Sequence, residues 1–199
     1  PGELIFSGLF GTGGTLSLDS GDGNLVLQRG SQVTVGSGAA TIDADLRMNN
    51  FTTGITLAKQ QLTQAATSLV ITGETSLYGG RIEVGGTLDF KGGLGQTGFT
   101  PFELDGGTVA GKTGAILSLD GDNNPTITGH GTWNIGLQNE GSIEAEFGDL
   151  IINGIGTSID WDGLGNDGVL RAEFGSLMLS NEPAFVFNSG LYLGNDNMI

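Results

Sequence analysis

Short runs of alternating apolar and polar residues recur along this chain, and glycines separate them. In one of these runs Ile143, Ala145 and Phe147 alternate with Glu144 and Glu146. Successive side chains of a β-strand point to opposite faces, so the three apolar residues are predicted to face a core and both glutamates to face solvent. The same pattern recurs at Thr15–Asp19, Leu25–Gln28, Gln32–Val35 and Thr41–Ala44.

A further apolar run follows after a glycine, as in Leu150–Ile152 and Leu177–Leu179. We therefore expect each repeating unit to contribute two or three strands that are separated by corners. Many brief strands joined by glycine turns exclude most helical architectures.

Internal repeats define the length of the unit. The segment Asn139–Leu150 matches the later segment Asn166–Leu177. A looser register follows four Gly-Thr pairs, which begin at Gly86, Gly107, Gly131 and Gly156. The distance along the chain between the two matching segments, and the distances between successive Gly-Thr pairs, fit one coil of a β-solenoid better than a propeller blade of about 40 residues. The sequence predicts an all-β fold: a right-handed parallel β-helix (β-solenoid) with coils of roughly 21–27 residues, about eight in all.

Composition agrees with one folded β-rich domain over residues 1–199. The chain has 38 Gly, 4 Pro and no Cys, without the Gly-X-Y period of collagen. Its 37% hydrophobic content is too high for a disordered glycine linker. Residues 55–70 depart from the scheme, because the glycine-free stretch Thr56–Leu69 tolerates either a short helical or irregular decoration or strand.

The pattern Asn-x-Gly-x-Ile/Leu-x-Ala-x-x-Gly-x-Leu, shared by the two copies that begin at Asn139 and Asn166, resembles repeats of large bacterial surface proteins. These are autotransporter passenger domains and filamentous-haemagglutinin-like adhesins, and the resemblance covers mainly residues 80–180. It implies a β-helix, an extracellular or cell-surface location, and a role in adhesion, aggregation or an extracellular coat.

The charge balance narrows the choice of partners. Seven Lys and Arg stand against 22 Asp and Glu, a formal net charge of −15, so nucleic acid and anionic membranes would be repelled. No stretch approaches the roughly 18 apolar residues that span a bilayer. Pro1-Gly2-Glu3 lacks the basic start of a signal peptide, so we expect any secretion signal to have been removed or to lie outside this segment. The end at Gly194–Ile199 lacks a closing element, so we expect the natural chain to continue.

Acidic glycine-containing loops make calcium a candidate cofactor. The segment from Asp120 to Asn124 begins like an EF-hand loop, but Pro125 replaces the turn glycine and Gly131 the twelfth-position glutamate. The segment from Asp160 to Gly168 resembles a loop of a calcium-binding β-roll. Asx-turns explain these loops equally well. The candidate calcium ligands are Asp120, Asp122, Asn124, Asp160 and Asp162.

The sequence holds no catalytic constellation, and we expect the protein not to be an enzyme. His130, the sole histidine, lies between two glycines and is expected to be an exposed corner residue. Carboxylate pairs two residues apart have glycosidase-type potential, but alternating strands produce them as well. These pairs are Asp43 with Asp45, Asp120 with Asp122 and Asp160 with Asp162. Five aromatic residues would offer a carbohydrate platform if exposed, although packing is the commoner role: Tyr78, Phe99, Trp133, Trp161 and Tyr192.

These observations predict an extracellular structural or adhesive protein that associates with copies of itself, through its ends or sides, into a filament, sheet or coat. Surface glycans are candidate partners. One alternative is a carbohydrate-binding or carbohydrate-processing β-helix of the phage tailspike or polysaccharide lyase type. Another is ice binding, which requires Thr-x-Thr ladders, and among the sequence runs only Thr126-Ile127-Thr128 has that form.

Overall fold

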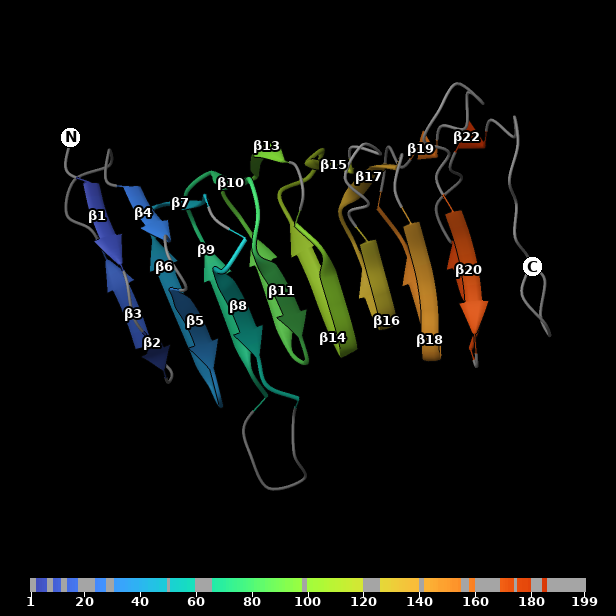
Figure 1. Cartoon of the computed structure of the whole chain (residues 1–199), viewed down its shortest axis with the longest axis horizontal. Helices are drawn as coiled ribbons and strands as arrows, with labels where there is room; N and C mark the ends of the chain where they lie inside the picture. The colour runs from blue at the N-terminus through green and yellow to red at the C-terminus, as the bar shows by residue number, and fades with distance from the viewer. Residues whose placement is uncertain are drawn as a thin grey trace.

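The protein is all-β with parallel sheets. The computed structural model describes residues 3–6, 9–11, 14–17, 24–27, 31–49, 51–59, 66–97, 100–119, 126–139, 142–154, 158–159, 169–173, 175–179 and 184–185. Within these ranges the chain forms 22 strands, and every pairing between them is parallel. Strands that pair come from successive passages of the chain, and they lie side by side along the long axis of the molecule (Figure 1).

The described strands form three sheets. The first contains β1 (Glu3–Phe6), β4 (Asn24–Leu27), β7 (Asp45–Met48), β10 (Thr75–Leu77) and β13 (Leu94–Thr97). The third contains β15 (Ile116–Leu119), β17 (Gly136–Asn139), β19 (Ser158–Ile159) and β22 (Ala184–Phe185).

The second sheet has two rows. One row contains β2 (Leu9–Gly11), β5 (Gln32–Val35), β8 (Gly54–Leu57), β11 (Arg81–Val84) and β20 (Val169–Glu173). The other contains β3 (Gly14–Ser17), β6 (Ala39–Asp43), β9 (Ser68–Ile71), β12 (Thr87–Phe90) and β21 (Leu177–Leu179). Three long strands run through both rows and join them: β14 (Phe102–Gly111), β16 (Thr126–Trp133) and β18 (Ser142–Ile152).

The chain visits the first or third sheet and then both rows of the second sheet in turn, and we call one such passage a coil. Each coil pairs with the next. The step from Ala39 to its partner Ser68 is longer than the predicted coil, and the step from Thr126 to its partner Ser142 is shorter. Coil lengths vary more widely than predicted because pairing fixes the strands and leaves the corners free to vary in length.

The repeat of Asn139–Leu150 in Asn166–Leu177 is confirmed as a structural register. Ser142 pairs with Val169 and Leu150 with Leu177. The looser Gly-Thr register holds for three of its four members, since Thr87 pairs with Thr108 and Thr108 with Thr132. It is wrong at the next step, where Thr132 pairs with Ile151.

Inward-facing apolar side chains stack from coil to coil into one continuous core. In the first row of the second sheet the buried members in register are Val33, Ile55, Ile82, Phe102, Ile127 and Ile143. Burying each of these side chains stabilises the fold by roughly 1.5–3 kcal/mol. Three buried aromatic rings meet in this core, where Phe102 contacts Trp133 edge to face at 5.0 Å and Phe90 at 6.5 Å between ring centroids.

Residues 55–70 are strand at both ends, in β8 and β9, and residues 60–65 lie outside the described residues. The Thr67 hydroxyl donates a hydrogen bond of 2.6 Å to the Ala58 carbonyl oxygen. The two ends of this excursion are therefore held together where it leaves and rejoins the sheet.

The alternation predicted for β18 is correct until the strand turns its corner. Ile143 and Ala145 are fully buried, and the two glutamates between and after them are partly exposed. The inward orientation predicted for Phe147 is wrong: this side chain is 77% exposed. Because Gly129 pairs with Ala145 and Gly131 with Leu150, the stretch from Glu146 to Asp149 lies opposite His130 alone. Phe147 adopts a positive φ of 59° in this bulge, which ends the period-two pattern.

Candidate functional site

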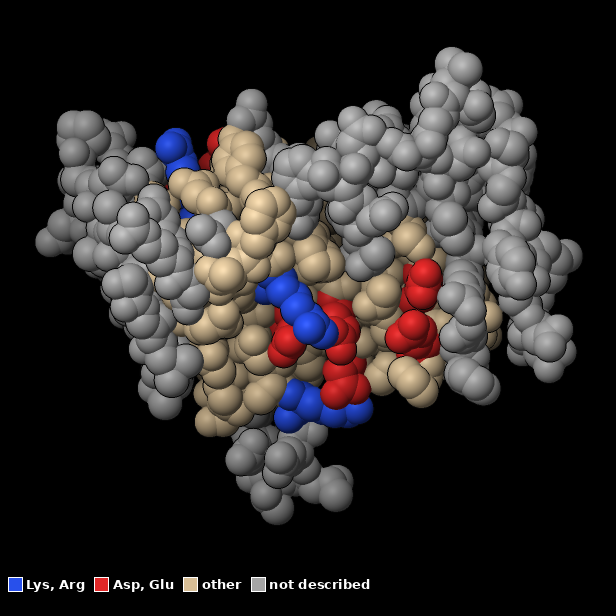
Figure 2. Space-filling view, in the orientation of Figure 1, with Lys and Arg blue, Asp and Glu red and all other residues tan. Residues whose placement is uncertain are grey.

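The outer side of the first row of the second sheet carries most of the charged side chains that the structure describes on that sheet, and we call it the charged face. It consists of Thr56, Lys59, Arg81, Glu83, Glu103, Asp105, Thr128, His130, Glu144 and Glu146. These residues alternate with the buried core residues of the same strands, so the period-two pattern positions them. Figure 2 shows cationic and anionic side chains close together over the middle of this face.

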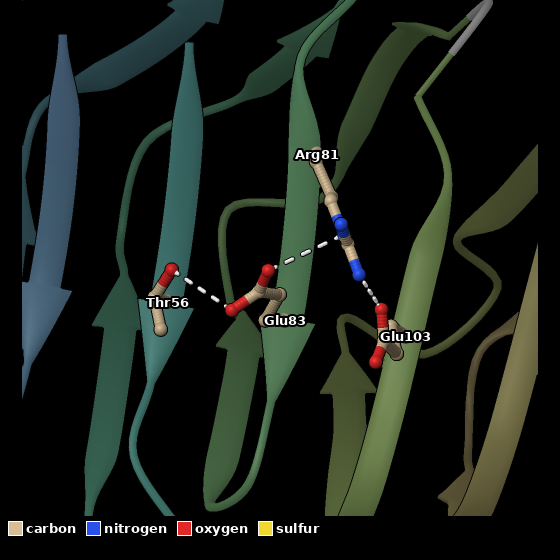
Figure 3. Close-up of polar contacts among 4 residues, drawn as sticks. All are labelled: Thr56, Arg81, Glu83 and Glu103. Atoms are coloured by element: carbon tan, nitrogen blue, oxygen red, sulfur yellow. Dashed lines mark hydrogen bonds and ion pairs between the residues drawn. The ribbon is translucent and has the colours of Figure 1, made fainter.

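A polar network crosses three neighbouring strands of the charged face (Figure 3). Arg81 Nε lies 3.3 Å from Glu83 Oε1, and the Arg81 guanidinium also pairs with Glu103 on the next coil. The Thr56 hydroxyl donates to Glu83 Oε2 at 3.5 Å. The charged groups are about half exposed, so each pair contributes at most about 1 kcal/mol. The network therefore orders the charged side chains on this face but contributes little to the stability of the fold.

His130 lies in β16 at the bend between Gly129 (φ 102°) and Gly131 (φ 139°). The predicted corner position is confirmed, but the side chain is only 25% exposed. Its Nε2 lies 3.6 Å from Asp105 Oδ1, which also accepts a 2.6 Å hydrogen bond from Lys59 Nζ. The carboxylate is thereby already paired with an ammonium group, and this arrangement is that of a surface ion pair rather than of a catalytic dyad.

The paired carboxylates Asp43 and Asp45 belong to different strands, β6 and β7. Asp43 Oδ1 accepts a hydrogen bond from the Thr72 hydroxyl, and Asp45 Oδ1 accepts one of 2.8 Å from the Glu74 amide. Donors from the next coil therefore offset both charges, as expected for a structural pair. The corresponding pairs at Asp120 and Asp122 and at Asp160 and Asp162 lie outside the described residues, as does Asn124, so the whole calcium candidate set does.

The two described members of the aromatic set do not form a common exposed surface. Trp133 is fully buried in the core, whereas Tyr78 is 40% exposed. Phe99, Trp161 and Tyr192 lie outside the described residues. Sequence reasoning missed the exposed aromatic residue at the β18 bulge, and the glycine that directly follows Phe147 is the one signal that marks a corner there.

A polar hollow of about 370 Å³ opens where β14, β16 and β18 end. It is lined by the turn Gly111–Ala115 and by Asn134, Gly136 and Asn153. The Ala115 amide donates to the Lys112 carbonyl oxygen at 2.9 Å and closes the turn, and the Gly136 amide donates to the Ala115 carbonyl oxygen at 3.0 Å. Its residues come from three coils and share no motif, so no pattern in the sequence predicts this site.

The described residues contain no cluster of three or more His, Cys, Asp or Glu side chains able to hold a metal ion. No helix in the same part of the chain has the length and apolar character needed to cross a membrane. The chain matches no protein-family model, no curated protein and no solved structure.

Proposed function

We propose that this chain is a segment of a right-handed parallel β-helix, and that it serves as an extracellular structural or adhesive surface protein that associates with copies of itself. The observation that carries the proposal is the unbroken parallel pairing from the first described coil to the last over one continuous core. Stacked coils of this kind make a long, rigid body whose outer faces repeat at the spacing between strands, about 4.8 Å.

The edge strands of the first and last described coils give a physical reason for self-association. Among the described residues, β1, β2 and β3 pair only with the coil that follows, and β20, β21 and β22 only with the coil before. An unpaired edge presents a row of N–H and C=O groups to which another strand can add. Contact between the two different edges is heterologous, so repeated contacts produce a filament rather than a closed dimer.

The test is sedimentation velocity and negative-stain electron microscopy of the whole chain over a wide range of concentrations. We expect assemblies that lengthen with concentration. A monodisperse monomer at high concentration would overturn the proposal of self-association.

Proline variants in β1 test the proposed contact itself. Neighbouring N–H groups of a strand point to opposite sides. Of Leu4→Pro and Ile5→Pro, one therefore removes a donor from the side of β1 away from β4 and the other a donor that pairs with β4. We expect the first to shorten filaments without loss of strand content by circular dichroism, and the second to destabilise the first coil. If both variants assemble like the parent chain, this edge is not the contact.

A chelator arm of the same experiment tests the calcium expectation for Asp120, Asp122, Asn124, Asp160 and Asp162. Loss of assembly in EGTA, restored by added calcium and not by magnesium, would place calcium at the subunit contacts. Unchanged assembly in EGTA would show that self-association does not require calcium.

Carbohydrate binding is a second candidate function, and the polar hollow favours it. Its lining offers amide, hydroxyl and backbone groups on a floor that is held by hydrogen bonds between coils. Such a site matches the many hydroxyls of a sugar better than it matches an apolar ligand.

A further inference from the structure

The floor of the hollow is preorganised. The backbone N–H of Asn134 donates to the Val109 carbonyl oxygen at 2.8 Å, and the backbone N–H of Asn153 donates to the Trp133 carbonyl oxygen at 2.7 Å. Since Trp133 pairs with Ile152, the two asparagines occupy neighbouring positions on adjacent coils. Both line the hollow, about one strand spacing of 4.8 Å apart, and each side-chain amide has both donor and acceptor groups.

Two lysines lie at neighbouring positions of adjacent coils, and one of them, Lys112, lines the hollow. Phe90 pairs with Gly111, so Lys91 and Lys112 follow on adjacent coils, and both are exposed. The stem of Lys112 lies over Gly93 in the preceding coil, with its Cδ 3.6 Å from where a β-carbon of that residue would stand. Among the described side chains no carboxylate lies within 4.0 Å of either ammonium group, in contrast to Lys59 on the charged face.

This pair of lysines is unusual in a chain with 22 acidic and 7 basic residues. Like charges at neighbouring positions of adjacent strands repel each other. A bound anion would relieve the repulsion by pairing with both ammonium groups. The two lysines therefore favour an anionic ligand, although the overall charge of the molecule would repel one.

We propose that the hollow binds an acidic saccharide unit, with the sugar carboxylate at Lys112 and Lys91 and the sugar hydroxyls at the amides of Asn134 and Asn153. The proposal rests on the second candidate function and specifies its ligand class. A volume of about 370 Å³ accommodates one or two sugar rings, so a longer polysaccharide would run across the hollow rather than end in it.

The binding experiment uses a tetrasaccharide of galacturonic acid and, as a matched neutral ligand, its methyl ester, both measured by isothermal titration calorimetry with the whole chain. We expect binding of the acid and at least tenfold weaker binding of the ester. Lys112→Ala is expected to weaken binding of the acid roughly three- to tenfold, and Asn134→Ala to weaken binding of both ligands.

Lys59→Ala is the matched control, since it removes the same charge from a site where the ammonium is already paired with Asp105. We expect it to bind the acid like the parent chain. Equal losses in Lys59→Ala and Lys112→Ala, equal binding of acid and ester, or no heat of binding at millimolar ligand would each overturn the site. Sedimentation of the same samples reports self-association separately, so failure of this site leaves that result standing.

Discussion

Replacing Thr75 by valine is expected to stabilise the protein, although the change deletes a hydrogen-bonding group from the core. Thr75 is fully buried between Leu46 and Leu94 of the adjacent coils, and its Oγ1 has no hydrogen-bond partner among the described residues. A buried hydroxyl without a partner costs about 1–3 kcal/mol, and valine replaces it with a methyl group of similar size. We therefore expect the free energy of unfolding to rise by about 1–2 kcal/mol.

Thr100→Val is the control, and it is expected to change the free energy of unfolding in the opposite direction. Thr100 is also buried, but its hydroxyl donates a 2.9 Å hydrogen bond to the Gly79 carbonyl oxygen. The same substitution there should lower the free energy of unfolding by about 1–2 kcal/mol, since it leaves that carbonyl unpaired. Urea denaturation at an unchanged m-value measures both effects, and each kcal/mol should move the melting temperature by about 2–4 °C. A loss of stability in Thr75→Val equal to that in Thr100→Val would refute the reasoning.

Further substitutions test other parts of the fold by urea denaturation. Gly129→Ala should lower the free energy of unfolding by at least about 2 kcal/mol, because φ is +102° and the new β-carbon would lie 2.0 Å from the Leu104 carbonyl oxygen. Gly36→Ala is the control: the space around Gly36 is open, so this change should be neutral or stabilise by up to about 1 kcal/mol. Phe102→Ala should cost about 3–5 kcal/mol through the cavity left between two aromatic rings; a smaller loss would mean that the core collapses. Arg81→Gln should cost under about 1 kcal/mol, and 1 M NaCl should abolish the difference from the parent chain.

Repeats in the sequence predicted the stacking of the coils well where strands pair directly. The match between Asn139–Leu150 and Asn166–Leu177 became the register of β18 with β20 and β21. Alternation likewise identified Ile143 and Ala145 as core residues. Both signals depend on the period-two geometry of a strand, and they apply wherever the backbone stays extended.

The alternation of apolar and polar residues did not predict the structure at the corners between strands. Phe147 continues the alternating pattern in the sequence, yet the bulge opposite His130 turns its side chain outward. The polar hollow was missed for a related reason: Lys112, Asn134 and Asn153 are brought together by pairing between coils and not by spacing within one. The register at these positions depends on corner lengths, which no local pattern encodes.

The corner between the two rows of the second sheet is also where the chain tolerates change. Short turns connect β5 to β6 and β11 to β12, whereas a much longer excursion connects β8 to β9, yet the flanking strands keep the same parallel register throughout. Doubling the length of a flexible connection adds only about 0.6 kcal/mol of closure entropy. Descendants of such a chain can therefore acquire or exchange recognition segments at this corner, one insertion at a time, without altering the strands that carry them. An engineer can graft a foreign epitope between Leu57 and Ser68 on the same grounds.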